Sequence, residues 1–158
     1  LVEFRVGSKD CERSKNYAKK AAELGATADT FIVSGSIWVE CGNLKEGTRF
    51  FEKALRLQPN DSGWNLTKRL IPMYYLQEDY SKIISLVEPH LDAIDVAPEM
   101  IAFYAFSKLQ DGDKNLAKTM FDRAKTMGIS KENLERVIRD SDKTEEFILK
   151  LSELGTIE

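Results

Sequence analysis

The sequence predicts an all-α fold in which short helical hairpins stack into a solenoid. Three observations favour this fold class: apolar residues recur at helical spacing in short segments, small residues stand among them, and the segments repeat about every 34 residues. A single hairpin of this length buries only part of its apolar surface, so it needs neighbouring hairpins to pack against. The rest of the sequence supplies such neighbours on both sides.

The clearest hairpin is predicted over residues 28–61. Its first helix carries an aromatic, a small and a second aromatic residue on one face. Gly42-Asn43 is predicted to end this helix, because glycine readily adopts the left-handed conformation that follows a helix. The second helix is predicted to end before Pro59, since the residue before a proline is driven out of helical geometry.

Other parts of the chain match this hairpin. Residues 98–131 match it at an offset of 70 residues, and residues 62–97 match it in phase and length. A helix predicted over 9–25 aligns with the hairpin's second helix at an offset of 33 residues. The first offset pairs Gly42 with Gly112, Phe51 with Phe121 and Ala54 with Ala124; the second pairs Tyr17 with Phe50, Ala21 with Ala54 and Leu24 with Leu57.

At these residues the chain resembles the tetratricopeptide repeat (TPR) family. The resemblance implies a right-handed α-α superhelix in which the first helices of the hairpins line a concave groove for partner proteins or peptides. Residues 28–61 carry the family pattern with Phe31, Gly35, Trp38, Gly47, Phe51, Ala54 and Pro59, and residues 98–131 carry it with Ile101, Ala105, Gly112, Ala117, Phe121 and Ala124.

We therefore expect a single TPR-like domain over residues 1–158. Because the chain starts inside a repeat, we expect further repeats or another domain before Leu1 in the parent protein, and an open end that can pair with a second copy as a homodimer. Pro72 and Pro89 are expected inside helices. The expected parts are a partial repeat (1–27, mainly its second helix), a repeat (28–61), a degenerate repeat (62–97), a repeat (98–131) and capping helices (132–158).

The two capping helices have predicted start signals. Ser130 is expected to cap the first of them, because a serine side chain accepts a hydrogen bond from a free backbone N–H in the first turn. Asp142 followed by Glu145 resembles a capping box for the last helix. That helix is expected to turn an apolar face, including Phe147, inward and a charged face to solvent, as the terminal cap of a solenoid requires.

Composition argues against several classes of function. The net charge of −3 gives no footprint for nucleic acid or anionic lipid, and no apolar run approaches the roughly 18 to 20 residues of a membrane span. No nucleophile, acid–base pair or metal set converges in the sequence, so we expect no enzyme, no cofactor and no metal site. The single histidine, His90, is interpreted as a packing irregularity of the degenerate repeat.

The two cysteines have two possible interpretations. Cys11 and Cys41 lie at helix ends that antiparallel packing brings together, so a bond between them is one interpretation. Free buried thiols are the favoured interpretation, unless the parent protein is exported to an oxidising compartment. The compartment is left open between the cytoplasm, which is favoured, and the periplasm.

The resemblance also predicts which residues line the groove. An aromatic floor beside a basic spot suits an amphipathic helix or an extended peptide with an acidic residue. The family's clamp for a C-terminal carboxylate is not reproduced, because the preceding repeat offers Ile32 and Ser36 where the clamp needs polar partners. The predicted partner-binding residues are Asn65, Lys68, Arg69, Tyr75, Phe103 and Phe106. The alternative left open is that Phe103 and Phe106 are core residues and that Lys68 and Arg69 are solvated surface residues.

The expected function is therefore a non-catalytic protein-interaction or scaffolding module. A first alternative is a regulatory or assembly TPR domain of a larger membrane-bound or enzymatic parent, packing on its own chain. A second is an RNA-binding helical repeat, which the acidic net charge and the apolar floor disfavour.

Overall fold

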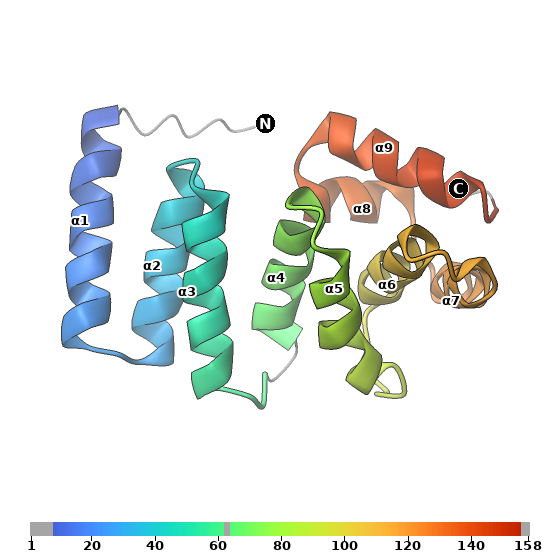
Figure 1. The fold of residues 1–158 in the computed structure, drawn as a ribbon, viewed down its shortest axis with the longest axis horizontal. Helices are drawn as coiled ribbons and strands as arrows, with labels where there is room; N and C mark the ends of the chain where they lie inside the picture. The colour runs from blue at the N-terminus through green and yellow to red at the C-terminus, as the bar shows by residue number, and fades with distance from the viewer. Residues whose placement is uncertain (1–7, 62–63, 156–158) are drawn as a thin grey trace. The chain divides into compact units, whose positions relative to one another are not determined.

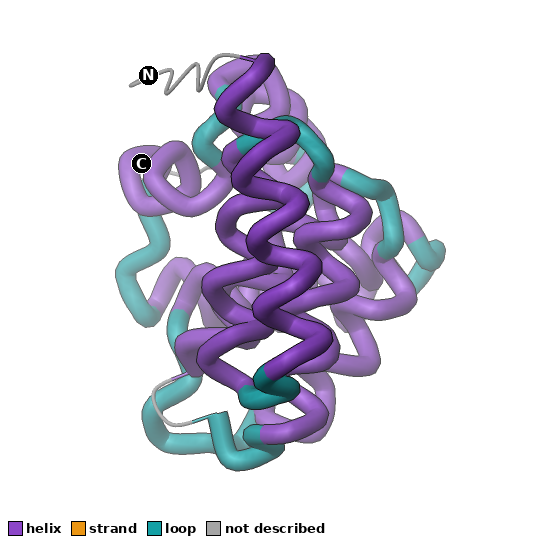
Figure 2. Tube along the Cα trace, turned by 90° about the vertical axis from the view of Figure 1, so that its left-hand side faces the viewer, coloured by secondary structure: helices purple, strands orange, loops and turns teal. Residues whose placement is uncertain are grey.

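The structure is a computed structural model that describes residues 8–61 and 64–155. Over these residues it contains nine α-helices, a short 3₁₀ helix and no strand (Figures 1 and 2). The predicted all-α class is thus confirmed. The chain divides into two compact units, Leu1–Met73 and Tyr74–Glu158, and each unit is described by itself. The proposed division into repeats stays a prediction.

The first unit holds α1 (Ser8–Leu24), α2 (Ala28–Glu40), α3 (Leu44–Leu57) and most of α4 (Asn65–Leu76). Figures 1 and 2 show α1, α2 and α3 side by side, with α2 in contact with both neighbours. The α4 helix continues through Pro72.

The turn between α2 and α3 follows the sequence prediction. Gly42 adopts a left-handed conformation, with φ +78°, directly after α2. The Asn43 side chain then caps α3 by accepting a hydrogen bond from the Glu46 backbone N–H. At the other end, α3 stops at Leu57, just before Gln58-Pro59. Both predicted helix ends are thus confirmed. They could be predicted because each depends on residues directly beside it.

Two glycines let the backbones of α2 and α3 approach closely. A Cβ atom added to Gly47 would clash with Val39 Cγ2 and lie 3.0 Å from the Gly35 carbonyl oxygen. A Cβ atom on Gly35 would lie 3.1 Å from the Gly47 carbonyl oxygen and from the Phe51 ring. The packing is therefore tight at both positions, and Gly47 is the position with the least room for a larger side chain.

The predicted register of α1 is wrong. Tyr17 is 59% exposed and Ala21 also faces solvent, although the alignment paired them with the buried Phe50 and Ala54. The buried face of α1 instead carries Ala18 and Ala22, with Cys11 further towards its start. The physical reason is that both alanine pairs have helical spacing, and only contact with α2 decides which pair is covered.

The cysteines are bonded, so the preference for free thiols is also wrong. Cys11 on α1 and Cys41 at the end of α2 form a disulfide, with Cα atoms 5.6 Å apart. The antiparallel run of α1 and α2 places the start of one helix beside the end of the other, as the alternative interpretation required. The serine hydroxyl of Ser34 adds a second link by donating to the Ala18 carbonyl oxygen at 3.0 Å.

The second unit contains the end of α4 and all later elements. Its most extensive helix pairing is between α6 and α7. The turn between these two helices has the same features as the turn between α2 and α3. Gly112 has φ +91°, and Asp113 caps α7 by accepting from the Leu116 N–H. Phe121 and Ala124 are fully buried, as predicted. The elements are α5 (Tyr80–Val87), η2 (Glu88–His90), α6 (Pro98–Gln110), α7 (Lys114–Thr126), α8 (Lys131–Ile138) and α9 (Ser141–Ser152).

Two local predictions in this unit are corrected. Pro89 does not lie inside an α-helix, because α5 ends at Val87 and the proline is the second residue of the 3₁₀ helix η2. The last helix is capped by Asp140 rather than Asp142: the Asp140 side chain accepts from the Lys143 N–H, and Asp142 lies in the first turn. The predicted Ser130 cap of α8 is confirmed, since its hydroxyl accepts from the Asn133 N–H.

Candidate functional site

Three of the predicted groove residues meet around a single ring of the last helix. Tyr75, Phe103 and Phe106 surround Phe147 of α9, with ring centroids 5.1, 4.8 and 4.6 Å from that of Phe147. We call these three residues the aromatic seat. Tyr75 also contacts Phe103 and Phe106 directly, edge to face. The structure therefore brings these three predicted residues together.

The prediction that this surface is an open floor is wrong. Tyr75, Phe103 and Phe106 are only 3%, 1% and 2% exposed. Phe147 itself is completely buried, so α9 covers the aromatic seat. The apolar face of α9 was recognised in the sequence, but a face by itself does not say which surface covers it. The α9 helix thus lies on the surface that was expected to bind a partner.

A hydroxyl group anchors the start of α9 to the aromatic seat. The Tyr75 hydroxyl donates a hydrogen bond of 2.8 Å to the Lys143 carbonyl oxygen. Burial raises the pKa of Tyr75 well above its usual value, and the nearby Glu146 carboxylate raises it further. The hydroxyl therefore stays protonated, and remains a donor, throughout the neutral and mildly basic range.

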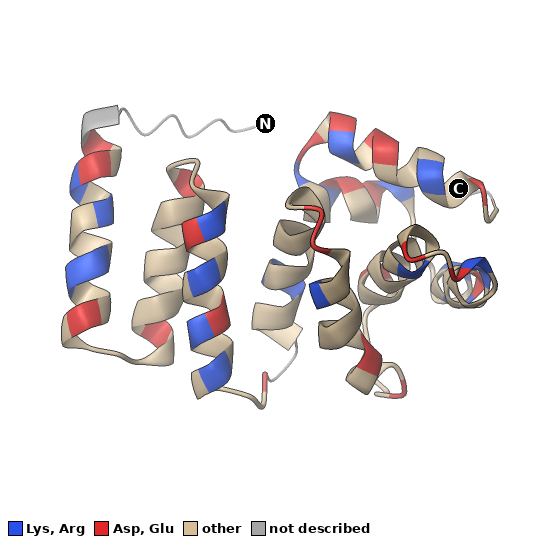
Figure 3. Ribbon diagram, viewed as in Figure 1, with Lys and Arg blue, Asp and Glu red and all other residues tan. Residues whose placement is uncertain are grey.

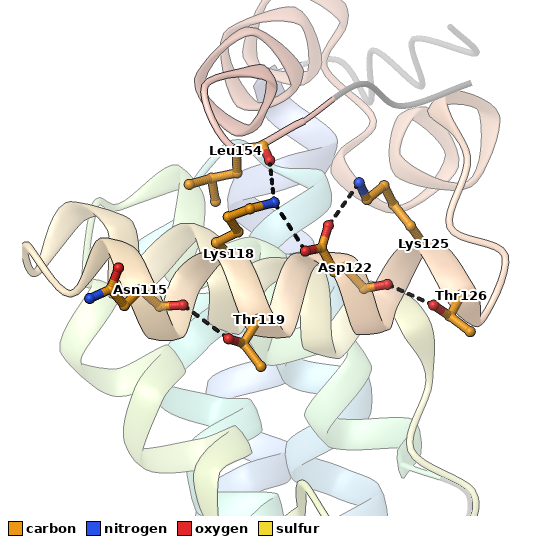
Figure 4. A network of polar contacts seen from close by, with 7 residues as sticks. All are labelled: Asn115, Lys118, Thr119, Asp122, Lys125, Thr126 and Leu154. Carbon is orange, nitrogen blue, oxygen red and sulfur yellow. Dashed lines mark hydrogen bonds and ion pairs between the residues drawn. The ribbon is translucent and has the colours of Figure 1, made fainter.

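A side chain of α7 contacts the turn that follows α9 (Figure 4). Lys118 Nζ donates to the Leu154 carbonyl oxygen at 3.4 Å and to Asp122 at 3.1 Å. Lys125 Nζ approaches the same carboxylate at 2.9 Å. Hydrogen bonds from Lys125 and Lys118 lower the pKa of Asp122. The carboxylate thus holds Lys118 in the position from which it reaches the turn after α9.

The polar groove candidates lie in the first unit. Asn65, Lys68 and Arg69 are exposed residues of α4. The Arg69 guanidinium lies over the ring of Phe51, 5.8 Å from its centroid. A cation in this position is attracted to the face of the aromatic ring. The structure therefore leaves this basic spot accessible in its own unit, whereas the aromatic candidates of the other unit are covered.

The first unit also has a cleft of about 380 Å³ between α1, α2 and α3. Phe31, Trp38 and Phe50 form its apolar lining. The Lys53 ammonium lies 5.5 and 5.3 Å from the centroids of Phe31 and Phe50. Two lysines and two glutamates, Lys19, Lys53, Glu23 and Glu46, also line the cleft, so its lining has no net charge. Sequence reasoning did not find this cleft, because its residues come from three helices.

Charge is distributed unevenly along the chain (Figure 3). Residues 1–73 contain 12 Lys and Arg against 9 Asp and Glu, whereas residues 74–158 contain 11 against 17. In Figure 3, α2 has charges only near its ends, while α1 and α3 carry both signs along their lengths. The basic spot thus belongs to the more basic part of the sequence.

Among residues 8–61 and 64–155, no group of three or more His, Cys, Asp and Glu side chains is arranged to hold a metal ion. Within the part of the chain that the structure describes, none of the helices combines the length and the apolar character needed to cross a membrane. No protein-family model matches the sequence, and no curated protein matches it significantly.

Proposed function

We propose that this chain is a non-catalytic protein-interaction module of TPR-like helical hairpins arranged as a right-handed solenoid. Two hairpins with the same turn chemistry support the repeat: Gly42-Asn43 and Gly112-Asp113 begin their second helices in the same way. Their small residues Ala54 and Ala124 are both fully buried. Small residues at such positions allow close helix packing, which a repeated architecture needs.

The observation that carries the proposal is the seating of Phe147. An aromatic side chain of an amphipathic helix fills a socket of aromatic side chains, which is how helices bind in the grooves of interaction domains. In this chain the helix is its own α9, bound in cis. The surface therefore has the chemistry to recognise a helix.

The same observation favours a second candidate function. A regulatory or assembly domain that packs on its own chain would also cover its concave groove with one of its own helices. On that alternative, α9 is the permanent ligand, and contacts with the remainder of the parent protein use the exposed basic spot of α4.

Charge reversal of this basic spot tests the proposal. The double variant Lys68→Glu with Arg69→Glu should weaken capture of partner proteins from extracts of the source cells, because the spot would repel an acidic partner. A matched control is Lys20→Glu with Arg56→Glu, since both residues are exposed in the same unit and the change in charge is equal. Quantitative mass spectrometry compares the captured proteins. Recovery of the same partners by both double variants and the wild type would remove the basic spot from the function.

A further inference from the structure

We propose that an amphipathic helix of a partner protein competes with α9 for the aromatic seat. The inference rests on the proposed function, because it names the class of partner that the aromatic seat binds. The occupant is a helix rather than an extended peptide, since the segment that fills the seat is helical from Ser141 to Ser152. The fold thus carries its own competitor for the site.

The buried face of α9 shows what the competing helix must present. Thr144, Phe147 and Leu151 are buried, and they follow one another at intervals of three and four residues. These intervals place all three on one side of the helix. Leu154 is also buried, but it lies in the turn after α9. A partner helix therefore needs a phenylalanine near its centre and a leucine four residues later. The Tyr75 hydroxyl adds no sequence preference, because it binds a backbone carbonyl that any helix carries.

Two hydrogen bonds from side chains of other helices reach the backbone of α9 and of the turn after it: the Tyr75 hydroxyl donates to the Lys143 carbonyl oxygen, and Lys118 donates to the Leu154 carbonyl oxygen. The ion pairs of α9, Lys143 with Glu146 at 2.8 Å and Lys150 with Glu153 at 2.9 Å, lie within the helix and travel with it. Lys118 would lose only a long bond to the Leu154 carbonyl oxygen and would keep Asp122. Release of α9 would therefore leave no charged side chain at the aromatic seat without its ion-pair partner.

The connection before α9 is short and strained. Only Arg139 and Asp140 separate α8 from α9. Arg139 has φ +58°, a left-handed conformation that a residue with a side chain adopts at a cost. Arg139 is the C-cap of α8, and rotation at this residue would change the direction of α9. The aromatic contact and the packing of α9 against α8 hold the closed arrangement.

A synthetic peptide tests the inference on the full chain. The probe is residues 140–155 with a fluorescent label, titrated against the wild-type chain and against Phe147→Ala, which vacates the seat. We expect the Phe147→Ala chain to bind the probe at least 10-fold more tightly than the wild type does. A probe with Phe147→Ala should not bind either chain. The matched control chain is Leu149→Ala on the exposed side of α9, and it should behave as the wild type does.

Three outcomes would overturn the inference. One is no binding of the probe to a Phe147→Ala chain that circular dichroism shows to be folded. Another is equal binding of both probes, which would mean that the aromatic ring is not recognised. The third is a wild-type dimer at the assay concentration with α9 exchanged between copies, which would assign the seat to a second copy of the chain.

A second measurement applies if Phe147→Ala does not fold. Hydrogen exchange on the wild-type chain should show α9 amides exchanging at least 10-fold faster than α6 amides, because α9 opens while the α6–α7 hairpin stays intact. Exchange of both helices at one rate would show that α9 opens only with the whole unit, and the inference would fail. The basic-spot variants are independent of this result, so partner loss in them with no peptide binding here would leave the proposed function standing.

Discussion

The ring of Phe147 on α9 stacks on the ring of Phe106 on α6, with centroids 4.6 Å apart and ring planes 7° from parallel. Tyr75 and Phe103 meet the same ring from other directions, at angles of 89° and 53°. Offset stacking and edge contacts are the favoured geometries of aromatic pairs and add about 0.5 to 1.5 kcal/mol per pair beyond burial. This cluster explains why a helix 12 residues long holds its place.

Truncation of Phe147 should strongly destabilise the second unit. Phe147→Ala removes a fully buried ring, and such changes cost about 3 to 5 kcal/mol because a cavity remains. Urea unfolding followed by circular dichroism measures the loss. Leu149→Ala is the matched control on the same helix: Leu149 is 73% exposed, so the expected change is below about 0.5 kcal/mol. Equal losses in the two variants would mean that Phe147 is not seated.

The disulfide should stabilise the first unit. Cys11 and Cys41 are 30 residues apart in sequence, and closing a loop of that size stabilises a fold by about 3 to 4 kcal/mol in the chain-entropy treatment. Cys11→Ser with Cys41→Ser should lower the free energy of unfolding by about this amount. Addition of dithiothreitol should do the same to the wild type.

The double serine variant is also the control for the reductant, since dithiothreitol should not change its unfolding. Alkylation under denaturing conditions without a reductant, followed by intact mass measurement, checks the bond itself. Two added alkyl groups on the wild-type chain would show free thiols and contradict the structure.

The close approach of α2 and α3 predicts a penalty for Gly47→Ala. The new Cβ would clash with Val39 and the Gly35 carbonyl, and overpacking of this kind costs about 1 to 3 kcal/mol. That exceeds the roughly 1 kcal/mol that alanine gains over glycine in a helix. Gly25→Ala is the control, because a Cβ there meets only ordinary contacts at 3.7 Å and should leave stability unchanged or slightly raised. Thermal unfolding compares the two variants, and a rise in Tm for Gly47→Ala would refute the packing.

The contact between Glu88 and Tyr104 predicts a dependence on pH. The Tyr104 hydroxyl donates to Glu88 at 2.7 Å, and this hydrogen bond, with the nearby Lys108 ammonium, lowers the pKa of the carboxyl. Because the folded pKa is below the unfolded value of about 4.3, the stabilisation is complete above that value and is lost as the pH falls through the folded pKa. Tyr104→Phe should raise the pKa of Glu88 and weaken this dependence.

Carbon NMR of the Glu88 carboxyl measures the titration directly. The midpoint in Tyr104→Phe should lie above the wild-type midpoint, while the remaining contact with Lys108 keeps part of the shift. An unchanged midpoint in the variant would show that the tyrosine hydroxyl does not hold the carboxylate.

Local features of the fold could be predicted from sequence, since their causes lie within a few residues. Gly42 and Gly112 supply left-handed turns, and Asn43 and Asp113 cap the next helices through their own side chains. Even local rules fail where two candidates compete. Asp140 and Asp142 both suit a helix start, and Asp140 prevails while its carbonyl also accepts from the Thr144 hydroxyl.

The candidate site could be predicted only in part. Repeat phase grouped Tyr75 with Phe103 and Phe106 correctly, but it gave no sign that Phe147 fills the space between them. That contact joins residues more than 40 positions apart and depends on where the two-residue connection after α8 directs the last helix. The register of α1 failed for the same reason, because only the neighbouring helix decides which alanines of α1 are covered.

The most direct test of the aromatic seat is a measurement of nuclear Overhauser contacts between aromatic rings in the full chain. Selective labelling of phenylalanine and tyrosine, with Phe147→Leu to assign the signal, identifies the Phe147 ring protons. We expect cross-peaks from this ring to Phe106 and to Tyr75. A Phe147 ring without cross-peaks to either residue, in a chain whose Tyr75 and Phe106 still contact each other, would contradict the seating of Phe147.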